Sequence, residues 1–414
     1  MKQHDAEVGK LDYCQICGKK NLFEAIDLGF QPPCGTLLNA DQLRDPETYY
    51  SLRLMICSDC GDGQLDYVVG SEICFPANYP YRPGISVPLR EHLERLAESV
   101  IEKNGLKSGD LVVDVGSNDG TLLSFFKAKD MTVVGVEPTN MADAAREQDI
   151  TTYQDPFNKD IAEYIVKKHG KAKVITFTNV FAHMASLGEV MDGLVTLLDK
   201  DGAVVSESQY LLDVLQGNQF DEIYHDHIRI YSLKALINLF AQYGMEVFDA
   251  KRVPTREGSI EVSAGFKGKH EISPNVQALL LAEEEARLFS EEAWLEFRHR
   301  VDEQSAKFTD FVVQAYTRGE KIVADSCPTR GVVLLNYYRL NNMPYVSQLP
   351  GTEKVGKYIP GTHTPIVSNE IILKDQPDYI LILAWHYADY IIKNWKDKGV
   401  KAKFIIPLPE FRIV

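Results

Sequence analysis

The sequence predicts an α/β protein built from three parts. Two Cys-x-x-Cys pairs stand near the start of the chain, in a stretch of short strand and turn patterns. From Leu111 onward, buried strand patterns alternate with helix patterns, as in a doubly wound and mostly parallel sheet. A second and smaller β-α alternation begins after Lys321. We expect the three parts to span residues 1–78, 79–262 and 263–414.

Composition limits the classes of partner. The chain has 414 residues, of which 45% are hydrophobic, and its formal net charge is −15. An acidic chain is a poor match for nucleic acid or an anionic membrane surface as the main partner, and a local basic patch stays open as an alternative. No apolar run approaches the roughly 18 residues of a spanning helix, and the start lacks the apolar region of a signal peptide. We therefore expect a cytoplasmic location. We also expect a monomer with no obligate protein partner.

The paired cysteines predict a metal centre. Each pair is followed by a glycine, which relieves the backbone strain of a turn that wraps a metal ion. Two such turns supply the tetrahedral thiolate set of a structural zinc site, with closed coordination. The alternative is two redox pairs or buried thiols. The expected zinc ligands are Cys14, Cys17, Cys57 and Cys60, whereas Cys34, Cys74 and Cys327 are expected to pack.

The remaining elements follow from periodicity. We expect a strand over residues 52–57, a break over the proline-rich stretch 74–86, and a helix over 88–104. The alternating region then predicts strands at 111–116, 132–137, 172–180 and 202–208, with helices at 121–129, 141–148 and 186–201 between them. Residues 278–319 predict one or two long amphipathic helices that lead into the C-terminal α/β part.

The sharpest ligand signal is VVDVGSNDGTLL, residues 112–123. A buried strand ends at Gly116, where bare backbone allows a ligand to approach closely. The next strand ends in Glu137, an acid placed to accept hydrogen bonds from a ribose. A dinucleotide loop would read G-x-G-x-x-G, but this loop has two glycines and contains Asp119. A carboxylate repels a pyrophosphate and attracts a sulfonium, so the loop favours S-adenosylmethionine over NAD. A plain crossover without a ligand is the third interpretation.

Other candidate cofactor contacts come from the same edge of the sheet, where open α/β sheets bind ligands. Asn179 stands at the end of the strand over 172–180, and Asp155 lies between that strand and the one over 132–137. The full set of cofactor candidates is Asp114, Gly116, Asn118, Asp119, Glu137, Pro138, Asp155, Asn179, Phe181 and Ala182.

The segment FDEIYHDHIRIYSL, residues 220–233, carries the candidate catalytic groups. It places Tyr224, His225, Asp226 and His227 in consecutive positions between a strand and a helix that opens at Ser232. Histidine titrates near neutral pH, so this set suits general acid–base catalysis. A metal site would need a third ligand, and a polar loop with capping histidines is the plainer alternative.

Two further places bear on the same site. His183 follows the Asn179 loop, which makes it either a catalytic group or an ordinary helix-start histidine. Tyr79, Tyr81 and Arg82 indicate either loop packing or a lid over the active site.

In order along the chain, these residues resemble the sugar C-methyltransferases that act on nucleotide-linked 4-keto deoxysugars. The resemblance covers nearly the whole chain. It includes LRLMICSDCGDGQL, YPYRPGIS, VDVGSNDGTLL, GVEPTN, NVFAHM, FDEIYHDHIRIYSL, LLNYYRL, GKYIPGTHTPI, YILILAW and IIPLPE. It implies an N-terminal zinc domain, a Rossmann-like core that binds S-adenosylmethionine, and a Rossmann-like C-terminal domain that helps to hold the nucleotide-sugar. Transfer of the methyl group would convert the cofactor to S-adenosylhomocysteine.

The resemblance also implies a mechanism. A general base removes the proton on carbon 3′ of the sugar, which the 4-keto group acidifies, and the enolate takes the methyl group. The family base lies in the motif that reads Tyr224-His225-Asp226-His227 here, and we expect His227 to be the base, oriented by Asp226. The groups expected around the sugar or enolate oxygen are Tyr224, Tyr79 and His183. The motifs further imply that Tyr79, Tyr81, Arg82, Asn336, Lys357, Tyr358 and His363 contact the substrate.

The chain departs from the family pattern where the substrate would be held. The family's glutamate is Asp226 here, and the usual glycine pair before Ser-Leu-Arg becomes residues 256–261, REGSIE. The small-residue loop Y-G-A-x-x-K-G becomes ADSCPTRG at 324–331, and L-L-A-W-N ends in His386. We expect a kept methyl-transfer core with a changed sugar or nucleotide, GDP being the alternative to dTDP. Two other classes stay open: an NAD-linked nucleotide-sugar dehydrogenase or dehydratase, and a non-catalytic zinc protein that binds S-adenosylmethionine.

Overall fold

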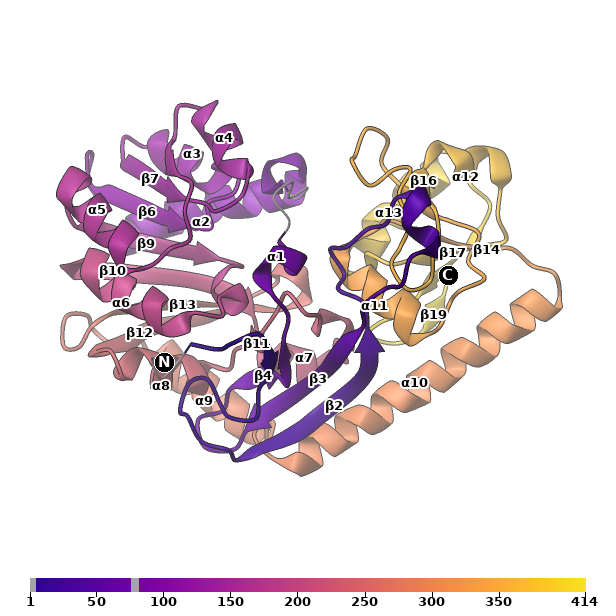
Figure 1. Cartoon of the computed structure of the whole chain (residues 1–414), viewed down its shortest axis with the longest axis horizontal. Helices are drawn as coiled ribbons and strands as arrows, with labels where there is room; N and C mark the ends of the chain where they lie inside the picture. Colours follow the sequence, from indigo (N-terminus) through magenta and orange to yellow (C-terminus); the bar gives the residue numbers. More distant parts are fainter. Residues whose placement is uncertain (1–4, 76–81) are drawn as a thin grey trace.

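A computed structural model describes residues 5–75 and 82–414 of the chain. Two lobes lie side by side. The long helix α10 (Glu291–Thr317) and the indigo hairpin of β2 (Leu22–Gln31) and β3 (Tyr50–Cys57) run beneath them (Figure 1). The larger lobe holds the seven-stranded sheet and the smaller lobe holds a six-stranded sheet. The predicted α/β class is confirmed.

The N-terminal part forms a small antiparallel sheet of order β11-β4-β3-β2. One of its strands, β11 (Arg229–Ile230), comes from the segment just after His227 and pairs with β4. The N-terminal part and the candidate catalytic segment are therefore joined by backbone hydrogen bonds. The other elements here are β1 (Gly9–Lys10), β2 (Leu22–Gln31), η1 (Ala40–Arg44), β3 (Tyr50–Cys57), β4 (Gly63–Leu65), β5 (Tyr67–Val68) and α1 (Ser71–Cys74).

The large sheet has the order β12-β13-β10-β9-β6-β7-β8. The five strands from β10 to β8 are parallel. β13 runs antiparallel to β10, and β12 pairs antiparallel with β13, so β12 at the edge of the sheet points in the same direction as the five parallel strands. Its strands are β6 (Leu111–Val115), β7 (Thr132–Val136), β8 (Thr151–Tyr153), β9 (Ala172–Thr178), β10 (Leu198–Gln209), β12 (Met245–Val253) and β13 (Ser259–Phe266).

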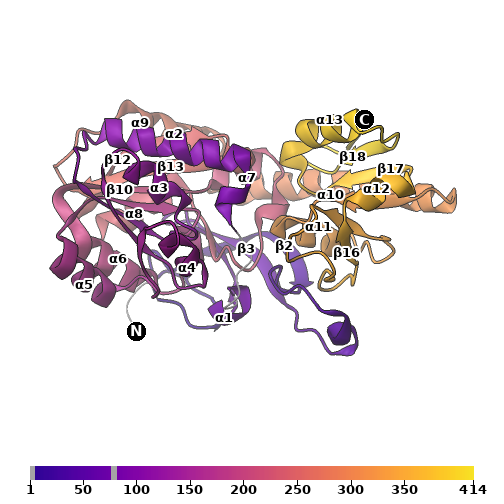
Figure 2. The same ribbon diagram turned by 90° about the horizontal axis from the view of Figure 1, so that it is seen from above.

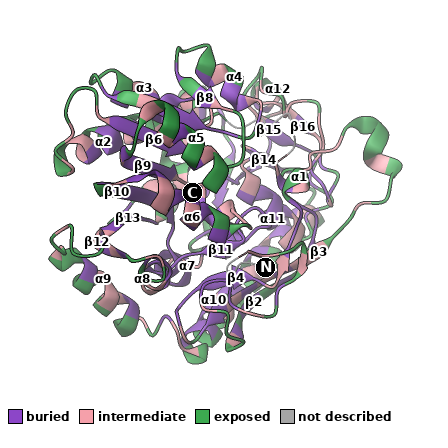
Figure 3. Cartoon of the chain, turned by 60° about the vertical axis from the view of Figure 1, so that its left-hand side comes forward, coloured by how far each residue is buried: buried purple, intermediate pink, exposed green. Residues whose placement is uncertain are grey.

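Helices cover both faces of this sheet, and purple strands run between helices whose outer faces are green (Figure 3). The central strand β6 is buried along its whole length, because both of its faces are packed. The helices and 3-10 turns are η2 (Pro83–Ile85), α2 (Val87–Lys103), α3 (Thr121–Lys127), α4 (Met141–Arg146), α5 (Lys159–His169), η3 (Phe181–His183), α6 (Leu187–Leu197), α7 (Leu211–Gln216), η4 (Phe220–Glu222), α8 (Leu233–Ala241) and η5 (Thr255–Glu257).

One expected boundary is wrong. The predicted helix over 186–201 ends at Leu197, because Leu198 already pairs with Ala172 of β9 as the first residue of β10. Strand pairing satisfies the backbone groups there, in place of another helical turn. The expected domain limit at residue 262 falls inside β13, which continues to Phe266.

The C-terminal part begins with two helices, α9 (Pro274–Glu285) and α10 (Glu291–Thr317). α10 passes beneath β2 and extends to the smaller lobe, as Figures 1 and 2 show, and Arg298 donates to the carbonyls of Glu24 and Ala25 on β2. The sheet that follows has the order β16-β15-β14-β17-β18-β19. Its elements are β14 (Ile322–Asp325), α11 (Thr329–Tyr337), β15 (Val346–Gln348), β16 (Ile366–Ser368), α12 (Glu370–Asp375), β17 (Tyr379–Ile382), η6 (Trp385–Tyr387), α13 (Ala388–Asp397), β18 (Lys403–Ile406) and β19 (Arg412–Ile413).

Among the described residues, no helix combines the length and the apolar character needed to cross a membrane.

Candidate active site and metal centre

The four predicted zinc ligands meet in space. The sulfur atoms of Cys14, Cys17, Cys57 and Cys60 all lie within 4.8 Å of one another. The turn glycines Gly18 and Gly61 adopt φ angles of +72° and +82°, where side chains are strained. Four thiolates at tetrahedral spacing fit a closed structural zinc site.

The cofactor loop leaves β6 at Gly116, whose φ is +70°. A Cβ atom at this position would lie 2.5 Å from the side chain of Val180, so the loop and the segment after β9 can approach only because Gly116 has no side chain. Val180 directly follows Asn179, and the loop and Asn179 therefore share one edge of the sheet.

The acids of the loop are held in place by backbone donors. The buried Glu137 carboxylate accepts hydrogen bonds from the backbone nitrogens of Asn118 (3.0 Å) and Thr139 (2.9 Å). Asp119 accepts from the Thr121 hydroxyl at 2.6 Å. Each carboxylate oxygen has two acceptor positions, so Glu137 retains capacity for ribose hydroxyls.

One buried polar atom at this edge calls for a ligand. Among the described residues, the Oδ1 atom of Asn179 has no hydrogen-bond partner. Asn179 also has a φ of +56°, which turns the chain away from the sheet. An orphaned acceptor beside Gly116 and Glu137 fits a cofactor that carries hydrogen-bond donors, as the amino acid portion of S-adenosylmethionine does.

The other cofactor candidates differ in placement. Asp114 accepts a hydrogen bond from Thr176 at 2.6 Å, and burial raises the pKa of its carboxyl to about 7. The Phe181 ring stacks on Tyr231 in the core, with ring centroids 5.5 Å apart, so only its backbone can face a ligand. Ala182 is buried, whereas Pro138 and Asp155 are exposed.

The candidate catalytic residues centre on His227, whose side chain is fully buried. Its Nδ1 lies 3.0 Å from the carbonyl oxygen of Glu222, and its Nε2 lies 2.8 Å from the Tyr224 hydroxyl. A carbonyl only accepts, so the proton of the neutral ring sits on Nδ1 and the lone pair on Nε2 faces Tyr224.

His183 joins this group. Its ring centroid lies 4.9 Å from that of His227, and its Nδ1 donates to the Asp226 carbonyl at 2.6 Å. The Asp226 side chain is buried, and this burial raises the pKa of its carboxyl to about 7. The structure thus brings Tyr224, Asp226, His227 and His183 together.

The His225 side chain points toward the N-terminal sheet and not toward His227. His225 directs its Nε2 to the Ser51 carbonyl of β3 at 3.3 Å, and its ring meets Tyr50 edge-on. Burial lowers the pKa of its imidazole to about 4, so it stays neutral at physiological pH. This placement fits a contact with the N-terminal sheet. Of the expected lid residues, Tyr79 and Tyr81 lie outside the described residues, and Arg82 is exposed.

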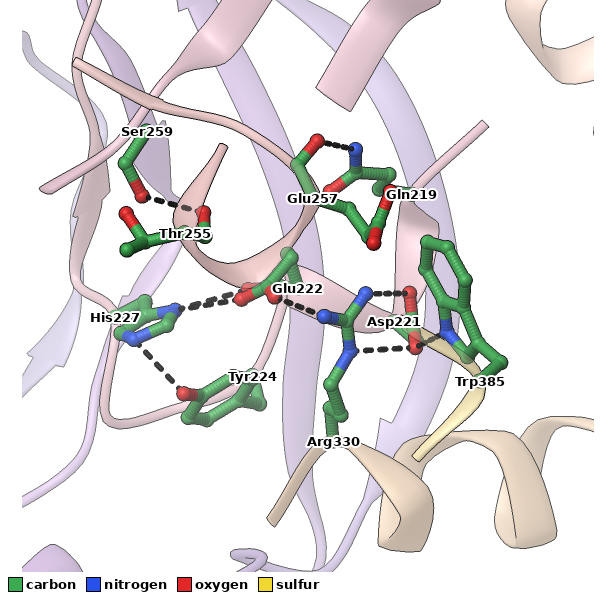
Figure 4. A network of polar contacts seen from close by, with 10 residues as sticks. All are labelled: Gln219, Asp221, Glu222, Tyr224, His227, Thr255, Glu257, Ser259, Arg330 and Trp385. Carbon is green, nitrogen blue, oxygen red and sulfur yellow. Dashed lines mark hydrogen bonds and ion pairs between the residues drawn. The ribbon is translucent and has the colours of Figure 1, made fainter. Parts of the chain in front are cut away.

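Sequence reasoning missed a buried network beside His227 (Figure 4). Arg330 of α11 holds Asp221 through two hydrogen bonds of 2.8 and 2.9 Å, and its Nη1 lies 2.5 Å from a Glu222 oxygen. The Trp385 indole donates to Asp221 at 2.8 Å. Nearby, the Gln219 side chain donates a hydrogen bond to the Glu257 backbone carbonyl.

These contacts involve residues at or next to three segments in which the chain departs from the family pattern. Arg330 of residues 324–331 and Trp385, next to the changed His386, both contact Asp221, whereas Glu257 of residues 256–261 contacts Gln219 through its backbone carbonyl. The departures were visible in the sequence, but their proximity was not, because the segments are far apart along the chain.

Of the four expected substrate residues of the C-terminal part, two contact the N-terminal part and two contact other residues of the C-terminal part. Tyr358 forms an antiparallel bridge with Leu38, and His363 lies 2.5 Å from Glu47. Asn336 donates to the Val332 and Pro360 carbonyls, and Lys357 accepts a backbone bond from Ile366. The contacts of these four residues are therefore with neighbours other than the Tyr224–His227 segment.

Comparison with known proteins decides the family. The chain is 32% identical to C-methyltransferase NovU of Streptomyces niveus over 411 residues, which is 98% of each chain. The chain belongs to this C-methyltransferase family. Three family models agree: a zinc binding domain over residues 14–75, a methyltransferase domain over 89–250, and a C-methyltransferase C-terminal domain over 254–409.

Membership of the C-methyltransferase family decides between the alternatives for the loop at Gly116. The enzyme is an S-adenosylmethionine-dependent C-methyltransferase, and the four-cysteine cluster is the zinc site of its N-terminal domain. The NAD-linked alternative is therefore set aside.

Two solved structures are also similar. One is 1,6-didemethyltoxoflavin-N1-methyltransferase of Burkholderia thailandensis, with 15% identity and a TM-score of 0.35 over 49% of this chain and 93% of that one. The other is magnesium protoporphyrin IX methyltransferase of Synechocystis, with 15% identity and a TM-score of 0.33 over 44% and 82%. Scores of this size establish nothing about the substrate of the C-methyltransferase described here.

Proposed function

We propose that the enzyme methylates carbon 3′ of a nucleotide-linked 4-keto-6-deoxysugar, in the biosynthesis of a branched-chain sugar. The observation that carries this proposal is the buried Tyr224–His227 pair, which presents a basic nitrogen next to the segment that carries Asn179 and His183. Methylation at carbon requires a carbanion. A ketone next to that carbon acidifies its proton, so that a histidine base can remove it.

The hydrogen bonds of His227 define which atom takes the proton. Nδ1 is occupied in donating to the Glu222 carbonyl, so Nε2 is the basic atom. The Tyr224 hydroxyl already occupies the lone pair of Nε2. The proton from carbon 3′ therefore passes to the phenol oxygen while the phenol proton moves to Nε2, and the electron pair of the broken C–H bond delocalises into the 4-keto group.

His183 lies beside this pair and is proposed to face the enolate oxygen. Its Nδ1 is fixed on the Asp226 carbonyl, which orients the ring. When bound, S-adenosylmethionine supplies an electrophilic methyl group on a positively charged sulfur. The chain's part is to hold the carbanion in line with that group, and such positioning contributes more than proton transfer alone.

The nucleotide is proposed to lie toward the C-terminal lobe, with dTDP as the family default and GDP as the alternative. A cleft of about 360 Å³ opens next to the network, and the aromatic side chains of Trp385, Tyr387 and Tyr390 contribute to its lining. Aromatic faces there suit stacking on a nucleobase. Replacing residues 324–331 by the common family loop tests this: an unchanged nucleotide preference would refute a role for that loop in the choice.

The test of the function is mass spectrometry of nucleotide-sugars incubated with the enzyme and S-adenosylmethionine. The panel holds dTDP- and GDP-linked 4-keto-6-deoxy and 4-keto-2,6-dideoxy sugars, and each is run beside His227→Ala. A product heavier by one methyl group that is absent with the variant supports the proposal. A methyl group on oxygen or on another carbon, located by NMR of the product, contradicts it.

A further inference from the structure

The buried acid pair Asp221–Glu222 lies between the candidate base and the C-terminal lobe. Both carboxylates are on η4, five and six residues before the histidine, and both are almost fully buried. A Glu222 oxygen lies 3.9 Å from Nδ1 of His227. Two adjacent buried carboxylates repel one another and are costly unless a cation neutralises them.

The cation comes from the other lobe. Arg330 is the second residue of α11, and only 5% of its surface is exposed. Its Nε and Nη2 atoms donate to the two carboxylate oxygens of Asp221, and its Nη1 atom faces Glu222. The Trp385 ring lies 4.7 Å from the guanidinium carbon, which adds a cation–π contact. Although burial opposes its charge, the two acids hold the pKa of Arg330 above its usual value.

We propose that Glu222 and Arg330 form a positioning pair that couples docking of the C-terminal lobe to the basicity of His227. Glu222 orients the ring through its carbonyl and raises its proton affinity through its carboxylate. Arg330 offsets that carboxylate when the lobe is docked, which keeps Nε2 neutral and able to accept a proton at physiological pH. This rests on the proposed role of His227 as the base.

The arrangement favours this role over direct substrate binding. A guanidinium with three close carboxylate contacts and a ring over its face has no side open to a phosphate. The pair also joins the two lobes beside His227. Neither residue is expected to touch the reacting atoms, so both act through His227.

Other titratable groups around His227 must be accounted for in any pH dependence. Tyr224, His183 and Glu222 face its ring directly. The groups come from five segments and are Asp221, Glu222, Tyr224 and Asp226 on and after η4, His183 on η3, Cys74 on α1, Glu257 on η5 and Arg330 on α11. Of these, only Glu222 and Arg330 are changed in the test, so the rest form a constant background.

The test is a titration of the His227 imidazole by NMR in the full-length zinc-loaded protein, with labelled histidine and no substrate. The His227 signal is the one missing from His227→Ala. Glu222→Gln removes a negative charge near Nδ1 and is expected to lower the pKa of His227 by roughly one unit. Arg330→Lys keeps a positive charge but cannot contact both carboxylates, so this variant is expected to raise the pKa of His227.

Arg298→Gln is the matched control. Arg298 also joins α10 to another part, through carbonyls of β2, but does not face His227. It is expected to leave the titration unchanged. Shifts of opposite sign in Glu222→Gln and Arg330→Lys support the coupling, and equal or absent shifts overturn it. The low-pH limb of kcat/KM should move in the same directions once a substrate is known.

The two proposals fail separately. If the titration shifts as expected but no nucleotide-sugar is methylated, the coupling stands and the proposed substrate is wrong. If methylation occurs and depends on His227 but the titration does not respond, the function stands and the positioning pair is refuted.

Discussion

The Tyr224 hydroxyl lies 2.8 Å from Nε2 of His227, and Nδ1 of the same ring is bound to the Glu222 carbonyl. The two contacts fix both the tautomer and the orientation of the imidazole. In the proposed mechanism, a proton that reaches Nε2 along this hydrogen bond passes the phenol oxygen.

This relation predicts that Tyr224→Phe and His227→Ala lose kcat to a similar extent, on the order of 10²–10⁴-fold. Both changes break the same proton path. His299, which is exposed on α10, provides a control through His299→Ala and should leave kcat unchanged. If Tyr224→Phe retained most of its activity while His227→Ala did not, the histidine would act on the substrate directly.

The close approach at Gly116 predicts a selective effect on cofactor binding. Gly116→Ala adds a Cβ that would meet Val180 at 2.5 Å and should weaken S-adenosylhomocysteine binding by at least tenfold, measured by calorimetry. Gly109→Ala is the matched control, because Gly109 also has a positive φ, +88°, but has no neighbour within 4 Å. It should cost only about 1 kcal/mol of stability. Equal affinities in the two variants would argue against this loop as the cofactor site.

The zinc site is expected to act through Gln15 on the segment after β9, which carries the cofactor candidates Phe181 and Ala182. Gln15 stands between the ligands Cys14 and Cys17, and its side-chain oxygen accepts from the fully buried Arg229. Arg229 in turn donates to the Phe181 and Met184 carbonyls, which flank His183.

Gln15→Ala should therefore keep its zinc, measured by elemental analysis, but bind S-adenosylhomocysteine several-fold more weakly, because a buried arginine loses a partner. Gln242→Ala removes another contact to the same turn, at the Ile16 carbonyl, and serves as the control. A Gln15→Ala protein with unchanged affinity would show that the zinc turn and the segment after β9 are independent.

Burial of Asp226 predicts a pH-dependent stability. Its pKa is raised to about 7 in the folded protein, so the folded state holds a proton that the unfolded state releases near pH 4. Stability from this group is present at low pH and is lost as the pH rises through 7. Asp226→Asn lacks this loss and should gain stability relative to the parent between pH 4 and 7, by up to roughly 1.4 kcal/mol per pH unit.

Denaturant unfolding of both proteins at several pH values measures this difference. Parallel stability curves would mean that Asp226 is ionised in the fold. Among the described residues, its Oδ1 atom has no hydrogen-bond partner, which is consistent with a neutral carboxyl.

Local sequence patterns determined much of this protein. The cysteine pairs with their glycines, the strand that ends at Gly116, and the cap at Ser232, whose hydroxyl accepts from Ala235 to open α8, all depend on neighbouring residues. Such features can be predicted from sequence because hydrophobic periodicity, turn-forming residues and ligand spacing each depend on only a few neighbouring residues. The α/β class, the zinc cluster and the cofactor followed from them.

The tertiary structure alone decided which side chains of a motif face the site. Four adjacent residues in Tyr224–His227 point to different partners, with His225 bound to β3 and His227 bound to Tyr224, because β11 pairs with the N-terminal sheet and turns the segment. It also placed Arg330 against Glu222, more than a hundred residues earlier in the chain. Long-range burial of charge is set by how the lobes pack, and no local pattern in the sequence records that packing.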